Sequence, residues 1–203
     1  MKGAIQMSNL ENYMKQQAIF CEQNDSISKN LYSEYGVKRG LRDEKGQGVL
    51  TGLTNISDIK AFEYHDGVKS PCDGELSYRG YNIKDLVTGS KGKRFVFEEG
   101  AYLLLFGELP TDTQLMEFQG RLSDCMELPT NFTRDVIMKA PTSDIMGSMT
   151  RSILTLGSYD KEKESLEIPN VLRQSMQLIA VFPMLAVYAY HAYCHYEKNE
   201  SMY

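Results

Sequence analysis

The sequence has no tryptophan, only three histidines and only four cysteines in 203 residues. Its cysteines, Cys21, Cys72, Cys125 and Cys194, are spread along the chain, and no two of them form a C-x-x-C pair. Zinc ribbons require such pairs and are excluded, and a disulfide framework of the small secreted type is not expected. The first residues contain no apolar run of the kind found in signal peptides. We therefore expect a reducing, cytoplasmic setting.

An excess of basic residues is also missing. Lysine and arginine together number 22 against 27 aspartate and glutamate residues, which gives a net charge of −5. Nucleic-acid-binding proteins usually carry a basic surplus, so no nucleic-acid partner is expected. The chain is 42% apolar and 24% charged, which is typical of a soluble globular protein. With 13 tyrosines and 11 methionines, the core is expected to rely on aliphatic, methionine and phenolic side chains.

The chain changes character twice. Residues 1–36 are predicted to form N-terminal helices, and residues 37–80 are rich in glycine with short β-prone stretches. The pairs Asp66-Gly67 and Asp73-Gly74 are turn signals, and we predict a hairpin across the second pair. From residue 81 to residue 203 the pattern is helical. The predicted class is all-α, with a small irregular β-containing segment near residues 45–80.

Start and stop signals divide the helical part into separate helices. Asn82 is expected to cap a helix that ends at Gly89. Thr111 and Gln114 form a capping-box pattern. A short helix is predicted over residues 130–139, and Ser143 is expected to cap the next helix, which stops at Gly157. These signals predict several helices joined by short connections.

The last predicted helix, residues 170–196, carries no charged residue between Arg173 and Glu197. Apolar and aromatic side chains occupy every face, so the pattern predicts burial on all sides. Glutamine and histidine side chains and Pro183 within the stretch argue against a membrane span. Few residues follow it, so we expect a partner subunit or further polypeptide to cover residues 174–196.

No complete reaction centre is apparent in the sequence. His191 and His195 are four residues apart beside Cys194, as in helical metal sites, but no third ligand is apparent. We expect no metal, and the role of the two histidines stays open. The glycines between Gly46 and Gly52 follow a charged loop rather than a buried strand, so they are interpreted as turn glycines and not as a dinucleotide site.

Stretches between about residues 37 and 196 resemble the citrate synthase family, in the family's order. The stretch at residues 74–86, GELSYRGYNIKDL, is similar to the entry into the family's helical large domain. The others are Gly40-Leu41-Arg42 with Gly48-Val49, residues 97–111 (FEEGAYLLLFGELPT), residues 141–146 (PTSDIM), and Phe182-Pro183-Met184 with Ala186 and Tyr188. The resemblance implies the N-terminal half of that large domain, with the small catalytic domain and the rest of the large domain absent.

The resemblance implies an acyltransferase of the tricarboxylic acid cycle that condenses acetyl-CoA with oxaloacetate to give citrate and CoA. It implies no metal and no cofactor, because acetyl-CoA is a substrate. In the family, two catalytic histidines, a catalytic aspartate and the oxaloacetate-binding arginines lie in the second half of a longer chain. This chain is therefore expected to be an inactive fragment with no catalytic residue of its own. Only Arg42 has a counterpart, an arginine that reaches the phosphates of CoA.

The resemblance also implies a homodimer, formed through the helices near residues 143–157 and 170–196, and no membrane. Three questions stay open. The enzyme could prefer the substrates of 2-methylcitrate synthase, which shares the scaffold, and its allosteric regulation is not indicated. The truncation could arise in nature or in preparation. The rival interpretation is a non-catalytic helical module for dimerisation or regulation.

Overall fold

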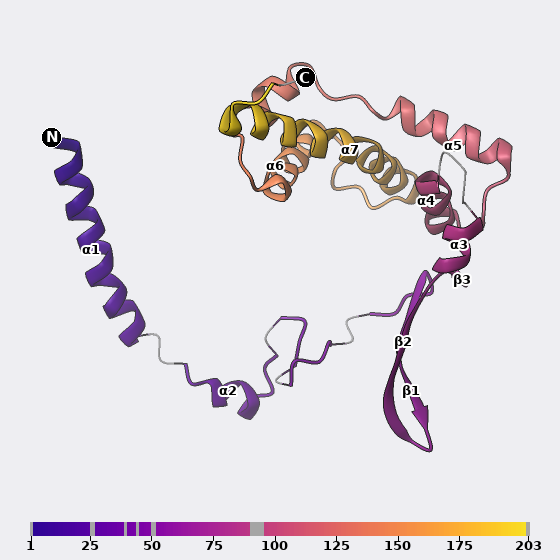
Figure 1. Cartoon of the computed structure of the whole chain (residues 1–203), viewed down its shortest axis with the longest axis horizontal. Helices are drawn as coiled ribbons and strands as arrows, with labels where there is room; N and C mark the ends of the chain where they lie inside the picture. The colour runs from indigo at the N-terminus through magenta and orange to yellow at the C-terminus, as the bar shows by residue number, and fades with distance from the viewer. Residues whose placement is uncertain are drawn as a thin grey trace. The chain divides into compact units, whose positions relative to one another are not determined.

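The computed structural model describes residues 2–24, 27–38, 40–43, 45–49, 52–89 and 96–201. The chain divides into two compact units, residues 1–54 and residues 55–203. The first unit contains α1 (Lys2–Asn24) and α2 (Lys29–Glu34). The second contains three strands and then a series of helices (Figure 1). Helices dominate and strands are few, so the predicted all-α class is confirmed.

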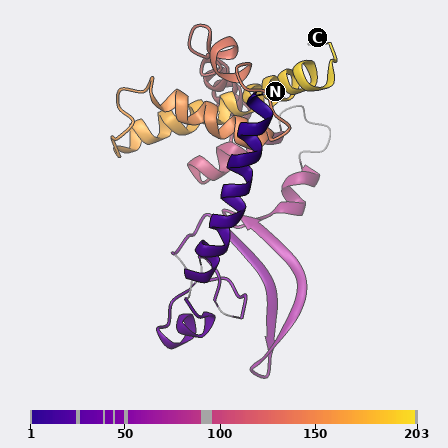
Figure 2. The ribbon, with the colours of Figure 1, turned by 90° about the vertical axis from the view of Figure 1, so that its left-hand side faces the viewer.

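The second unit begins with a long antiparallel hairpin, β1 (Ser57–His65) and β2 (Val68–Tyr78), followed by the short β3 (Tyr81–Asn82). Figure 2 shows the two long strands side by side. The turn lies at Asp66 and Gly67, whose φ angles of 52° and 80° suit a tight two-residue hairpin loop. The predicted hairpin across Asp73-Gly74 is therefore wrong. Those residues lie within β2, where the pairing register with β1 shifts.

The turn at Arg79 and Gly80, between β2 and β3, ties the hairpin to the helices. Arg79 has a positive φ of 49°, and its Nη2 donates a 2.9 Å hydrogen bond to the Leu104 carbonyl on α4 (Val96–Phe106). Asn82 Oδ1 accepts a hydrogen bond from the Lys84 N–H at the start of α3 (Ile83–Gly89), which confirms the predicted cap. The base of the hairpin is thus fixed by local polar contacts.

Helices α4 and α5 (Asp112–Asp124) pack through aromatic rings. The capping box predicted at α5 is present, because the Thr111 hydroxyl accepts from the Gln114 N–H while the Gln114 side chain accepts from the Thr111 N–H. Phe118 is 4% exposed, and its ring lies edge-on to those of Tyr102 and Phe106, with centroids 5.5 and 5.9 Å away. Edge-to-face arrangements are favourable for aromatic pairs.

The main core lies between α6 (Ile145–Gly157), α7 (Ile168–Lys198) and a π-helical turn, η1 (Thr133–Ile137). Its buried residues come from η1, the residue before it and α7: Phe132, Ile137, Val181, Leu185 and Ala189. Helix α6 packs against them with the partly buried Ile145, Met149, Ile153 and Leu156. The short helix predicted over residues 130–139 is confined to this π turn. Ser148 and Ser152, four residues apart on α6, are each 2% exposed. Such small side chains let a helix approach its neighbour closely.

The N-cap of α6 is Asp144 rather than the predicted Ser143. Asp144 Oδ1 accepts a 2.9 Å hydrogen bond from the Gly147 N–H, which satisfies one of the unpaired donors of the first turn. A carboxylate also interacts favourably with the positive end of the helix dipole.

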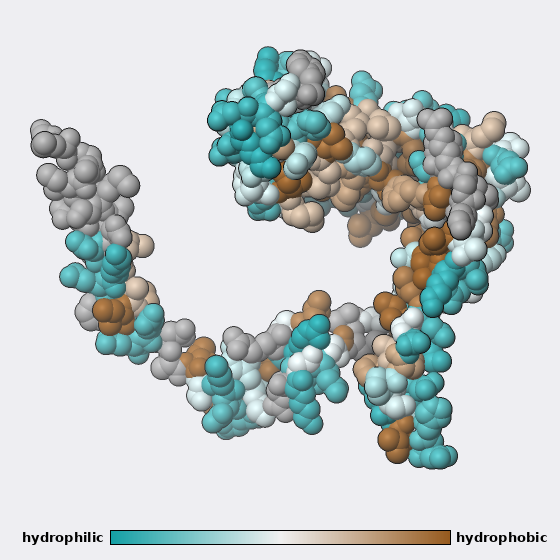
Figure 3. Space-filling model, viewed as in Figure 1, coloured by the Kyte–Doolittle hydropathy of each residue, from teal (hydrophilic) through white to brown (hydrophobic). Residues whose placement is uncertain are grey.

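In its middle, between the buried Ala180 and Cys194, helix α7 is buried on one side only. Val181, Leu185, Ala189 and Ala192 are at most 4% exposed and recur at helical spacing. On the opposite side Val187 is 51% exposed and Tyr190 is 50% exposed, and Pro183 is also exposed. Burial of this helix on all sides is therefore not seen within the described part of the chain. Figure 3 shows hydrophobic side chains at the surface of the region formed by α6 and α7.

We call Pro183, Val187 and Tyr190 the outward stripe of α7. A similar stripe on α6 consists of Met146, Thr150 and Leu154, which are all exposed. By length and composition, α7 is the one helix of the described residues that is long and apolar enough to cross a membrane. The core helix of a soluble protein meets the same criteria of length and composition.

The close approach of Gly147 to the Asp144 carboxylate gives the first prediction. A Cβ at residue 147 would lie within 2.8 Å of Asp144 Cγ, so Gly147→Ala displaces the capping carboxylate. Losing an N-cap usually costs about 1 kcal/mol, so in urea denaturation we expect the unfolding free energy of this variant to be about 1 kcal/mol lower than that of a Gly→Ala variant elsewhere in a helix. Gly120→Ala on α5 is the matched control, because a Cβ there meets nothing within 4 Å. It should gain up to about 1 kcal/mol from helix propensity. Equal effects of the two substitutions would contradict the cap.

Candidate functional site

Arg42, the one site residue predicted from the sequence, lies in a compact loop of the first unit. It forms an isolated antiparallel bridge with Gly48, and its Nη1 donates a 2.8 Å hydrogen bond to the Gly46 carbonyl. Asp43 Oδ1 accepts hydrogen bonds from the backbone N–H groups of Lys45 and Gln47. Gly46 has a φ of 77°, which a residue with a side chain rarely adopts. The loop is therefore held by its own polar groups.

This geometry defines what Arg42 can do. The guanidinium carries five N–H donors in a planar fork, and one described hydrogen bond holds it to the loop. Its side chain is exposed. A fork of this kind suits a phosphate oxygen pair better than a flexible lysine does.

His191 and His195 do not form a metal site with other residues of the described chain. His195 Nδ1 lies 3.0 Å from the carbonyl oxygen of Glu200, just beyond the C-terminus of α7, and its ring packs on Tyr196. His191 packs its ring edge against Tyr190. Within the described residues, no group of three or more His, Cys, Asp or Glu side chains is placed to hold a metal ion. The contacts of the two histidines are those of side chains near the C-terminal end of a helix.

A hollow in the second unit lies where α5 ends, α6 ends and α7 begins. It has a volume of about 630 Å³. Its lining contains apolar side chains, which we call the floor, and charged and amide side chains, which we call the polar rim. The floor includes Leu128, Ile153, Leu156, Leu178 and Val181, and the polar rim includes Asp124, Glu127, Asp160, Lys163, Arg173, Gln174 and Gln177. The rim mixes both signs of charge, so it does not favour a purely anionic or a purely cationic ligand.

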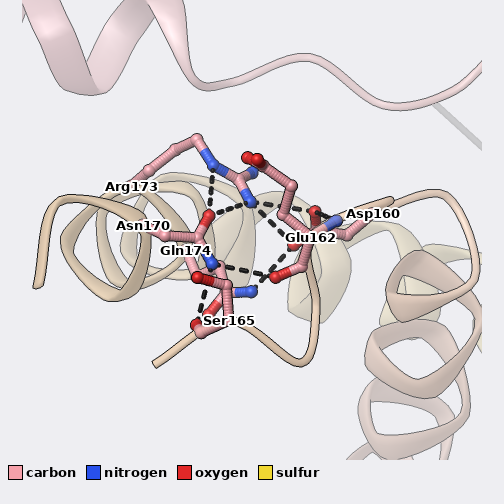
Figure 4. Close-up of polar contacts among 6 residues, drawn as sticks. All are labelled: Asp160, Glu162, Ser165, Asn170, Arg173 and Gln174. Carbon is pink, nitrogen blue, oxygen red and sulfur yellow. Dashed lines mark hydrogen bonds and ion pairs between the residues drawn. The ribbon is translucent and has the colours of Figure 1, made fainter. Parts of the chain in front are cut away.

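Asp160, which lines this hollow, is at the centre of a cluster of polar contacts (Figure 4). Arg173 Nη2 lies 2.9 Å from both Asp160 carboxylate oxygens, and Gln174 Nε2 donates to Oδ2 at 2.9 Å. The backbone N–H of Glu162 donates to Oδ1 at 3.0 Å. The side chain of Asp160 is only 18% exposed, although it belongs to a connecting loop. The carboxylate therefore receives donors from both sides.

The same donors act on the ionisation of Asp160. The hydrogen bond from Gln174, and then those from Arg173 and the Glu162 N–H, hold the pKa of the Asp160 carboxyl below its usual value. Because the folded-state pKa is lowered, this interaction stabilises the fold at pH values above the unfolded pKa. It is lost as the pH falls through the lowered folded pKa.

The sequence did not predict this cluster of polar contacts around Asp160. Asp160 and Arg173 are 13 residues apart, and the loop between them has no periodicity to predict that they meet. The one available signal was the placement of Arg173 and Gln174 in the first turns of α7, ahead of a stretch without charged residues that extends to Glu197.

Comparison with known proteins decides the family. A family model described as the C-terminal domain of citrate synthase matches residues 41–202. The chain belongs to the citrate synthase family. The match includes Arg42, the hairpin and every helix of the second unit, and it leaves most of the first unit outside. The predicted family is thereby confirmed.

The curated relatives include citrate synthases and 2-methylcitrate synthases. A citrate synthase of Saccharolobus solfataricus is 30% identical over 154 residues, which cover 76% of this chain and 35% of the relative. A 2-methylcitrate synthase of Shewanella oneidensis is 34% identical over 116 residues, 57% of this chain and 28% of the relative. The chain thus spans about a third of the length of the curated relatives it matches. These relatives show the citrate synthase family and do not distinguish between its two kinds of enzyme.

Solved structures agree. The citrate synthase of Pyrobaculum aerophilum matches with a TM-score of 0.58 and 25% identity, covering 74% of this chain and 36% of that one. A ternary complex of citrate synthase from Thermoplasma acidophilum with carboxymethyl coenzyme A and oxaloacetate matches with a TM-score of 0.60 and 19% identity. It covers 72% of this chain and 35% of that one, and at this identity it shows the fold alone. Both matches support a citrate-synthase-like helical fold.

Proposed function

We propose that this chain is the N-terminal part of a citrate synthase large domain. The enzyme to which it belongs would condense acetyl-CoA with oxaloacetate and hydrolyse the thioester to give citrate and CoA. The observation that carries this proposal is the family match over residues 41–202, combined with relatives about three times as long as the matched region. Its setting would be cytoplasmic, and it would need no metal or resident cofactor.

The proposed reaction requires an acid–base centre. A carboxylate removes a proton from the acetyl methyl group, one imidazole hydrogen-bonds the developing enol oxygen, and a second polarises the ketone of oxaloacetate. The three histidines of this chain do not supply this set. His65 is exposed on the hairpin beside Glu63, and the other two finish α7. We therefore propose that the chain by itself has no turnover and contributes scaffold to the enzyme.

Arg42 is proposed to contact a phosphate group of CoA. The loop fixes its backbone, and among the described residues one hydrogen bond, to the Gly46 carbonyl, engages the five donors of its guanidinium. Its neighbours Gly40 and Gly46 have positive φ angles, so the loop shape depends on residues without side chains.

The proposed assembly is a homodimer through α6 and α7. A twofold interface uses the same surface on both copies, so an exposed apolar stripe on one copy can meet its own equivalent. The outward stripes of α6 and α7 include Leu154, which is 73% exposed, and Met146, which is 72% exposed. Covering such side chains is the usual function of a subunit interface.

Two alternatives follow from particular observations. Relatives named 2-methylcitrate synthase favour a substrate with one more methylene group in the acyl chain, as in propionyl-CoA. The absence of a matching acid–base set in the described residues favours a non-catalytic helical module that dimerises or regulates.

A thiol-release assay tests the proposed inactivity. The purified chain, incubated with acetyl-CoA and oxaloacetate, is expected to release CoA at the rate of a protein-free blank, because the reacting groups are not in it. Propionyl-CoA should give the same result. CoA release that depends on oxaloacetate would contradict the proposal.

The reading frame tests the positive part of the proposal. A coding sequence that continues beyond Tyr203 and encodes histidine and aspartate motifs supports the enzyme. A stop codon directly after Tyr203 supports the non-catalytic module instead.

Light scattering tests the assembly. The chain has a mass of 23.1 kDa, and light scattering is expected to give about twice that mass for the particle in solution. Val187→Asp should weaken association by about tenfold or more, because it places an unpaired carboxylate in the interface. Met116→Asp is the matched control, since Met116 is 70% exposed on α5 and lies outside both stripes. A folded wild-type monomer, or equal weakening by both variants, would contradict the dimer.

A further inference from the structure

The connection between α6 and α7 has no apolar anchor beyond its first residues. Tyr159 still packs its ring on Phe132, with centroids 6.5 Å apart. From residue 160 to residue 167 every residue is described, and none is buried. Leu166, the one large apolar side chain in this stretch, is 87% exposed. The hydrophobic effect therefore does little to fix the position of residues 160–167, which we call the strap.

Polar contacts to the first turns of α7 hold the strap instead. Arg173 and Gln174 bind the Asp160 carboxylate. Asn170 Nδ2 donates to the carbonyl oxygens of Glu162 and Ser165 at 2.9 and 3.0 Å. Asn170 is itself oriented by Arg173, whose Nε and Nη2 donate to Asn170 Oδ1 at 3.1 and 2.7 Å. Figure 4 shows these side chains converging on one region of the strap. Arg173 is shared by both attachments, so the contacts form one linked unit.

The strap lies against the 630 Å³ hollow. Its residues Asp160 and Lys163 line that hollow, and so do Arg173 and Gln174 on α7. The floor beneath is apolar and includes Val181, which is 1% exposed. Cys125, at the end of α5, also lines the hollow and is only partly exposed. Movement of the strap away from α7 would remove one wall and uncover this floor.

We propose that the strap is a gate for the hollow and that the Asp160–Arg173 pair, with Gln174 and Asn170, is its latch. When the latch is closed, the strap limits the entry of solutes from the side of α7. When the latch opens, the strap moves about Tyr159, which stays on Phe132, while the core around Val181 and Leu185 remains packed. Local opening of this kind is expected where few apolar contacts and several exposed hydrogen bonds hold a segment. This inference is independent of the proposed function.

Alkylation of Cys125 measures the opening. Short pulses of N-ethylmaleimide on the full native chain, followed by mass spectrometry of peptides, give a separate rate for each cysteine. Asp160→Asn removes the charge of the latch and keeps its size. It is expected to raise the Cys125 rate about fivefold or more, because a charge-assisted hydrogen bond is lost. Cys194 on α7 is 3% exposed, and its rate should not change because the helical core stays packed.

Asp135→Asn is the matched control. Asp135 also pairs with an arginine, Arg134, through hydrogen bonds of 2.7 and 2.8 Å, but it does not line the hollow. This variant should leave the Cys125 rate unchanged. The proposal is overturned if Asp160→Asn does not accelerate Cys125, if it accelerates Cys194 in parallel, or if Asp135→Asn accelerates Cys125 equally.

A second pair of variants tests whether the contacts act as one latch. Asn170→Ala should also accelerate Cys125, since it frees the carbonyls of Glu162 and Ser165. Combined with Asp160→Asn, it should give less than the product of the two separate accelerations, because Arg173 links both attachments. A fully multiplicative effect would show two independent attachments and overturn the single latch.

Discussion

The second unit depends on the packing of α7. This helix of 31 residues supplies Val181, Leu185 and Ala189 to the core that also contains η1 and α6, and Ala180 to the cluster with Phe118. The two clusters contact different sides of α7, because Val181 directly follows Ala180 and consecutive helical residues point roughly 100° apart. Between Ala180 and the buried Cys194, the side with Val187 and Tyr190 remains exposed. A helix apolar on both sides is stable in water only when both sides are covered. The fold of one copy therefore leaves its longest helix half covered.

Polar contacts act where this apolar packing does not reach. Arg79 fastens the hairpin to α4, Asp144 starts α6, and Asp160 fastens the connection from α6 to α7. The contacts of Arg79 and Asp160 join separate elements, the contact of Asp144 caps α6, and none of the three belongs to the main core. The core thus sets the arrangement of the helices, while these polar contacts set the positions of the segments between them.

Much of the secondary structure could be predicted, because its signals are local. The capping box of Thr111 and Gln114 and the cap at Asn82 depend on residues within three positions of each other. The hairpin turn was misplaced because two Asp-Gly pairs carry the same signal, and only strand pairing favours Asp66-Gly67. The polar contacts of Asp160 could not be predicted from the sequence, since Asp160 and Arg173 are 13 residues apart and an irregular loop lies between them. One-sided burial of α7 was also missed, because a pattern that is apolar all round does not show which side meets the core.

The central claim is that a second copy covers the outward stripe of α7. Hydroxyl-radical footprinting over a range of protein concentrations tests it directly, with Tyr190 as the probe and Tyr64 on the hairpin, which is 68% exposed, as the internal reference. The account predicts that Tyr190 becomes protected relative to Tyr64 as the concentration rises and regains its reactivity on dilution. A Tyr190 oxidation rate that keeps a constant ratio to that of Tyr64 at every concentration would contradict the account.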